Sequence, residues 1–149
     1  MKNLYEPATS REIKDRIAQL QTGSPAQWGK MNVAQSVAHC AASMEWAVGD
    51  RIPPKMFFPS LIGRAIKGKV FADDKPFRRN TPTAPELLVP DQRELNLERK
   101  RLLTLIDRFV AGPAACTKHS HSFFGKLTPD EWAILTYKHL DHHLRQFGV

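Results

Sequence analysis

Histidines are concentrated in the C-terminal sequence KHLDHHLRQFGV, where His139, His142 and His143 account for three of the chain's six. His139 and His143 are four residues apart, so in a helix their rings lie about one turn apart on one face and can converge on a point. Neutral imidazoles are the commonest protein ligands for transition metals. A third ligand from another helix would complete a metal site with open positions.

A helical projection at about 100° per residue separates these histidines. His139 and His143 fall in the apolar stripe of the helix, together with Trp132 and Leu135. His142 falls at the charged margin of that stripe. We therefore expect His139 and His143 to be ligands, and His142 to be an outsider or a residue that contacts the ligands or the substrate.

An earlier predicted helix, which starts after Asn32, offers His39 as a third histidine. Gln35, Ser43 and Trp46 share the face of His39, and a separate apolar stripe runs along another face. A single helical histidine is often a hydrogen-bonded packing residue, and an HxxxH pair elsewhere also arises by chance. From spacing alone, His39 is therefore either a packing residue or the third ligand.

The loop KHSHSFFGKL adds His119 and His121. Both fit the surface or the packing of a loop. The alternative is that His121 reaches the mouth of a pocket, where it contacts substrate or completes the coordination sphere. Gln35, Ser43 and Gln146 are candidates for hydrogen bonds to the ligands or to substrate.

Length and composition predict one globular domain over residues 1–149, because 42% of the residues are apolar and 25% are charged. Cys40 and Cys116 lie outside any CxxC pattern, so neither a disulfide framework nor a zinc ribbon is indicated. The sequence has no apolar run of membrane-spanning length and no secretory signal at its start. A cytoplasmic protein is the expectation.

The formal net charge of +7 is spread over small basic groups and not over one long run. Nucleic-acid binding proteins usually carry a recognisable module or interleaved aromatic residues, and neither occurs here. The charge therefore indicates a solvated basic surface that favours anionic ligands.

Four long helices are predicted. The first follows Thr9 and Ser10 as cap and ends near Gly23; the others run from Asn32 to Gly49, from about Asp91 to Gly112, and from Thr128 to Gly148. The segment 49–90 carries most of the prolines and cannot be one long helix, although PSLIGRAIKGKV could form a short helix opening at Pro59. Its aromatic residues indicate a segment packed on the body. The predicted fold is all-α, a four-helix bundle with a long proline-rich crossover after the second helix.

The order of these motifs resembles the DinB/YfiT-like superfamily of metalloenzymes: a histidine in the second helix, then His-x-x-x-His-x-x-Gln at His139, His143 and Gln146. The segments WGKMNVAQSVAHC and FFGKLTPDEWAILTYKHLDHHLRQFG look like a branch of unknown function, and the similarity spans most of the chain. The resemblance implies an up-down bundle that holds one divalent ion, often zinc or nickel, through His39, His139 and His143. It also makes a homodimer plausible.

Characterised relatives in that superfamily include thiol S-transferases, which join low-molecular-weight thiols to electrophiles, and a thiol-dependent maleylpyruvate isomerase. The resemblance therefore implies a metal-dependent enzyme acting on a small molecule. A non-enzymatic metal- or ligand-binding stress-response protein and a metal-dependent hydrolase are the alternatives, and a nucleic-acid binder is disfavoured. The extra His142 and the proline-rich segment depart from the family pattern, which leaves the choice between His142 and His143 and the shape of the pocket open.

Overall fold

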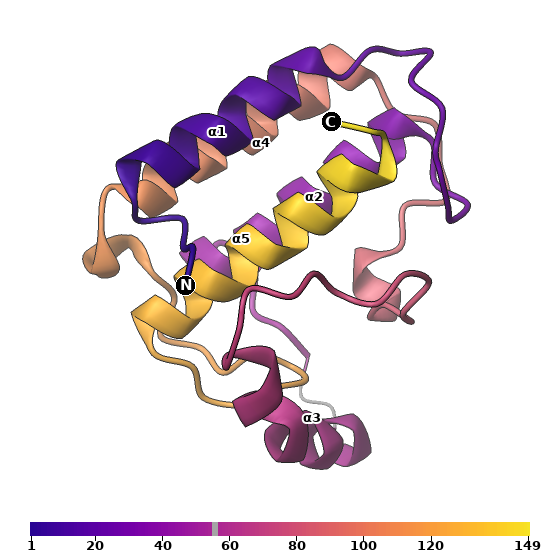
Figure 1. Ribbon diagram of the computed structural model, residues 1–149. Coiled ribbons are helices and arrows are strands. Elements are labelled where there is room, and N and C mark those ends of the chain that lie inside the picture. Colours follow the sequence, from indigo (N-terminus) through magenta and orange to yellow (C-terminus); the bar gives the residue numbers. More distant parts are fainter. Residues whose placement is uncertain (55–56) are drawn as a thin grey trace.

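The computed structural model describes residues 1–54 and 57–149 (Figure 1). Within these residues the chain forms helices and no strand, apart from one isolated β-bridge between His121 and Gly125. The all-α prediction is confirmed. The described residues form five α-helices: α1 (Pro7–Gln19), α2 (Val33–Val48), α3 (Phe57–Val70), α4 (Leu95–Val110) and α5 (Pro129–Gln146).

Four of the helices pack on one another around the core. α2 contacts α4 and α5, and α1 also contacts α4 and α5. Figure 1 shows α3 at one end of the molecule, apart from these four helices. The apolar stripes of the four helices face one another, as their sequence periodicity predicts. Their fully buried side chains include Ile13, Ile17, Met44, Leu102, Ile106, Phe109, Trp132 and Leu140.

The two helices that carry the candidate ligands begin at capping boxes. The side chain of Asn32 accepts from the backbone N–H of Gln35, and the backbone N–H of Asn32 donates to the side-chain oxygen of Gln35. Thr128 and Glu131 form the same pair of bonds at the start of α5. α2 ends at Gly49, whose φ of 83° lies in the left-handed region that favours glycine. Both starts and the end of α2 agree with the sequence prediction, and they set the register of the histidines.

The first helix differs from its prediction at both ends. It begins at Pro7, so Thr9 and Ser10 are buried inside the helix and are not its cap. The hydroxyl of Thr9 donates to Glu6, and that of Ser10 donates to the carbonyl of Pro7. Proline at the first position has a φ that suits a helix start and lacks a donor that would be unpaired there. The helix ends at Gln19, before the predicted stop near Gly23.

The helix predicted to start near Asp91 is α4, and it begins later than predicted. Its first residue is Leu95, four positions after Asp91. The reason is the cap: the carboxylate of Glu94 accepts hydrogen bonds from the backbone N–H groups of Asn96 and Leu97. Capping by this glutamate satisfies donors that the first turn leaves free.

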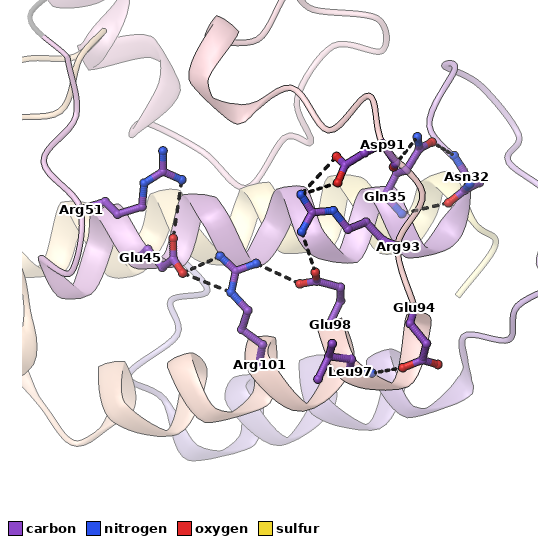
Figure 2. Close-up of polar contacts among 10 residues, drawn as sticks. All are labelled: Asn32, Gln35, Glu45, Arg51, Asp91, Arg93, Glu94, Leu97, Glu98 and Arg101. Atoms are coloured by element: carbon purple, nitrogen blue, oxygen red, sulfur yellow. Dashed lines mark hydrogen bonds and ion pairs between the residues drawn. The ribbon is translucent and has the colours of Figure 1, made fainter.

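A chain of ion pairs joins α4 to α2 (Figure 2). The carboxylate of Glu98 is buried and accepts from Arg93 at 3.2 Å and from Arg101 at 2.9 Å. Arg101 also pairs with Glu45 of α2, which in turn pairs with Arg51. Because Glu98 is paired on both sides, its charge is tolerated in the interior. The network fixes α4 against the helix that carries His39.

The crossover between α2 and α4 is attached to α5 by two lysines. Lys67 of α3 pairs with Glu131 at 2.8 Å. Lys138 of α5 is buried and donates to the carbonyls of Val70 at 2.7 Å and Asp73 at 2.6 Å. Lys138, on the charged side of α5, is therefore covered by the crossover.

The short helix predicted to open at Pro59 is α3, which begins two residues earlier, at Phe57. Phe71 and Phe77, which follow it, pack against the core, as expected of a segment held on the body. The side chains of Leu61 and Ile62 are about 60% exposed. No helix in residues 1–54 and 57–149 combines the length and apolar character that a membrane crossing requires.

Candidate metal centre

Three histidines from two helices meet where α2 faces α5. His39 of α2 and His139 and His143 of α5 each offer one ring nitrogen, and these nitrogens lie within 4.8 Å of one another. Their ring centroids are 4.7–4.9 Å apart. This histidine group could hold a metal ion, and it unites the three residues that the sequence singled out from positions a hundred residues apart.

The orientation of His39 is fixed by a backbone carbonyl. Its Nδ1–H donates to the oxygen of Leu87 at 2.8 Å, and a carbonyl can only accept, so the proton lies on Nδ1. Nε2 of the buried ring is therefore unprotonated, and it lies 3.0 Å from Nε2 of His139. A carbonyl partner behind a histidine is the usual arrangement around a bound metal. Leu87 ends a 3₁₀ turn, Pro85–Leu87, that the sequence did not reveal.

The orientation of His143 is fixed by Gln146. Nδ1 of His143 lies 2.9 Å from Oε1 of Gln146 and 3.2 Å from the hydroxyl of Ser36. The amide of Gln146 donates to the carbonyl of Trp28 at 2.7 Å, so its oxygen faces the histidine. Nδ1–H is therefore the donor, and Nε2 of His143 is free to act as a ligand.

Among these neighbours, Gln146 is a predicted contact and Ser36 is not. Ser36 precedes His39 by three residues and so lies on the neighbouring turn of the same helix face. That spacing is a signal that could have identified it.

Burial keeps the histidine group neutral. Desolvation lowers the pKa of His39, lowers that of His139 far below the ordinary value of 6.5, and lowers that of His143 to about 3. Neighbouring imidazoles lower the pKa values of His139 and His143 further. Two unprotonated Nε2 atoms therefore face the centre at neutral pH, and no carboxylate belongs to the group. The donor set fits a divalent ion of the zinc type, which binds neutral imidazoles without first displacing protons.

His142 points elsewhere. It does not belong to the group of converging nitrogens among the described residues. Its half-buried ring lies 5.6 Å from the ring of Trp28 and 6.3 Å from that of Phe77. Of the two histidines between which the sequence left the choice open, His143 belongs to the group that could hold an ion.

His121 packs at the other end of the same interior. Its Nδ1 accepts hydrogen bonds from the backbone N–H groups of Phe123 and Phe124 at 3.0 and 3.2 Å. Its ring lies 5.3 Å from that of Trp132 and 6.3 Å from that of Trp46. Burial lowers its pKa to about 4. It is a neutral side chain that holds the loop, with its remaining proton on Nε2.

Two further candidates lie outside the hydrogen bonds of the histidine group. Gln35 caps α2 and donates to the carbonyl of Asp91 at 3.2 Å. Ser43 lies one turn beyond His39 and is partly buried. His119 is exposed in its loop.

Both cysteines are free thiols in the interior. Cys40 and Cys116 are buried, and burial raises the pKa of each thiol. Neither belongs to the histidine group. Because a thiol reacts and ligates as the thiolate, these two residues fit a structural role.

Comparison with known proteins gives one result. Residues 6–148 match the family described as "Protein of unknown function (DUF1569)". No curated protein and no solved structure matches the chain.

Proposed function

We propose that this chain, which belongs to the DUF1569 family, is a divalent-metal-dependent enzyme that transfers a low-molecular-weight thiol to a small electrophile. The observation that carries the proposal is the convergence of three neutral histidines, two of which have Nδ1 already bonded to a fixed partner. The proposal includes a DinB-like four-helix bundle made of α1, α2, α4 and α5. The two unpaired cysteines favour a reducing compartment, and so the cytoplasm.

His39, His139 and His143 would hold the ion, and zinc and nickel are the expected metals. A bound ion of this kind supplies a Lewis acid with an open position, which favours deprotonation of a thiol. The neutral ligands leave the full charge of the ion available for that purpose.

The chain's own residues position the ligands and limit the water around them. Leu87 and Gln146 hold His39 and His143 in the tautomer that presents Nε2. Trp46 and Trp132 are buried at the end of the site where His121 packs. A dry and preformed ligand set avoids reorganisation when substrate arrives.

The proposal is tested with untagged protein, stripped of metal and reconstituted with zinc or nickel. The assay joins glutathione, cysteine or coenzyme A to a chlorodinitrobenzene: the thiolate sulfur forms a bond to the ring carbon, chloride leaves, and the thiol proton goes to buffer. We expect turnover only in the loaded protein, and a loss of at least about a hundredfold in His39→Ala and His143→Ala. His119→Ala, in an exposed loop, is the matched control and should be unchanged.

Metal content is measured on the same samples. Wild type and His142→Ala should bind one equivalent after reconstitution, whereas His39→Ala should not. Absence of metal from reconstituted wild type would reject the proposal. Stoichiometric metal without thiol transfer would favour the second candidate, a metal-dependent hydrolase, because an open position beside three imidazoles can also bind water and lower its pKa. Metal without any turnover would favour a non-enzymatic metal- or ligand-binding stress-response protein.

A further inference from the structure

A cavity of about 350 Å³ lies beside the histidine group. It is formed where three distant parts of the chain meet: the loop before α2, the crossover after α3, and the end of α5. A volume of this size falls in the range of small-molecule pockets, which is roughly 300–1,000 Å³. The residues that line it include Trp28, Phe77, Arg79, His142 and Arg145.

The cavity is cationic. Neither aspartate nor glutamate lines it among the described residues, whereas two arginines do. The guanidinium of Arg79 lies over the ring of Trp28, 4.1 Å from its centroid. Stacking holds the planar group in place and leaves its edge N–H donors available for a ligand.

Arg145 uses only part of its hydrogen-bonding capacity within the protein. Nε of Arg145 donates to Asp141 at 2.7 Å, and the same carboxylate accepts from Arg16 at 2.8 Å. Arg16 also pairs with Glu12 at 3.4 Å, whereas among the described residues Arg145 pairs with no carboxylate besides Asp141. Arg16 also donates to the carbonyl oxygen of Val149 at the rim.

The cavity is coupled to the histidine group through shared residues. The ring of His142, which lines the cavity, contacts the ring of His143 edge-on at 5.1 Å. The carbonyl of Trp28 is bonded by Gln146, whose oxygen orients His143. A molecule bound in the cavity therefore lies one side chain away from the candidate ligands.

We propose that this cavity is an anion-binding subsite, in which Arg79 and Arg145 bind the carboxylate or phosphate of a small organic molecule and Trp28 and Phe77 pack against its apolar part. Describing that molecule as the substrate rests on the proposed function. The binding itself does not, because every group in the cavity is present without metal. Arginine forks suit carboxylate and phosphate geometry equally, so the test includes both anions.

The experiment measures binding of benzoate, phenyl phosphate and uncharged benzamide by isothermal titration calorimetry. Metal-free wild type and His39→Ala are both titrated, so that the result does not depend on a metal. We expect at least one of the two anions to bind about tenfold or more tightly than benzamide, and the better anion identifies the ligand class.

Arg79→Gln and Arg145→Gln should each weaken binding of that anion about tenfold and leave benzamide unchanged. Arg78→Gln is the matched control, because it removes the same charge from the adjacent residue, which does not line the cavity. Its effect should be less than about twofold, since a charge that does not contact the ligand is screened by solvent and salt. Thermal unfolding of each variant confirms that the fold is retained.

Equal binding of benzamide and the anions, or no binding of any probe, overturns the subsite. A loss in Arg78→Gln as large as that in Arg79→Gln also overturns it, because the attraction would then come from the general basic surface. If the anion binds as expected but reconstituted wild type takes up no metal, the subsite stands and the proposed function fails.

Discussion

At the scale of single residues, the partner of each Nδ1 atom decides what its histidine can do. His39 and His143 donate from Nδ1, which leaves Nε2 free toward the centre. His121 accepts at Nδ1, so its proton must lie on Nε2. His121 therefore has the opposite hydrogen-bonding role to His39 and His143.

A prediction at this scale concerns His121 and pH. Its pKa is lowered from 6.5 to about 4 in the folded protein. Between these values the unfolded chain binds a proton that the folded protein does not, so stability falls as pH falls through this window. At about 1.4 kcal/mol per pKa unit, the contribution is at most about 3.5 kcal/mol. His121→Asn keeps an acceptor for the loop and does not titrate, so this variant should lose less stability on acidification.

Urea unfolding of the metal-free protein at pH 7 and pH 4.5 measures this difference. His119→Asn, in the exposed part of the same loop, should lose as much stability as wild type. An identical acid-induced loss in His121→Asn and wild type would contradict the prediction.

The sequence could identify the residues that meet but not all of their partners. Four-residue spacing and the helix face selected His139 and His143, and Gln146 follows three residues later on the same face. The acceptor for His39 could not be found in this way, because it is a backbone carbonyl 48 residues away. A carbonyl belongs to every residue, so its position depends on the path of the crossover and not on a residue type.

At the scale of helices, the ends depend on local chemistry that the sequence showed only in part. The capping boxes before α2 and α5 have a recognisable pattern, and both starts were predicted. The start of α4 was placed too early because Glu94 is an uncommon cap residue, whereas aspartate, as at Asp91, is a common one. Periodicity also predicted the apolar side of α4, but not that Glu98 would be buried between two arginines.

The prediction for this element is that Glu98 stabilises the contact between α4 and α2. Glu98→Gln preserves the shape of the side chain but removes the charge that faces Arg93 and Arg101. We expect it to lower the free energy of unfolding by about 2 kcal/mol, the scale of hydrogen bonds to charged groups. Glu86→Gln, at an exposed position of the crossover, should have no effect.

Urea unfolding at low and high salt provides the measurement. Because Glu98 is buried, most of the loss should persist at 1 M salt, where exposed pairs are screened. A loss below about 0.5 kcal/mol would show that the network orders side chains without stabilising the helix pair.

At the scale of the whole molecule, the histidine group joins the second helix to the last. His39 lies on α2, and His139 and His143 lie on α5, so an ion bound by all three would link two helices that already pack together. A ligand that binds only the folded state stabilises it by mass action, by about 2.7 kcal/mol at a hundred times its dissociation constant. For a chain of this length, that corresponds to roughly 5–10 °C in Tm.

We therefore expect zinc to raise Tm of the stripped protein and magnesium to leave it unchanged, since magnesium prefers oxygen ligands. Thermal unfolding of wild type, His39→Ala and His119→Ala makes the comparison, and only His39→Ala should lose the zinc effect. A similar zinc-induced rise in all three proteins would indicate metal bound at another place.

The hydrogen bond between His39 and Leu87 also limits how the crossover can vary in length. The crossover must bring one carbonyl back to His39 after a long excursion, and the short turn Pro85–Leu87 makes that return. Insertions and deletions elsewhere between α2 and α4 alter the loops on either side of the turn, and the entropy of loop closure changes slowly with loop length. A change of a single residue inside the turn would instead move the carbonyl away from the imidazole. The loops of this segment that contact neither α2 nor α5 should thus tolerate gain and loss of residues, whereas the turn and the carbonyls bonded to Lys138 should keep fixed positions.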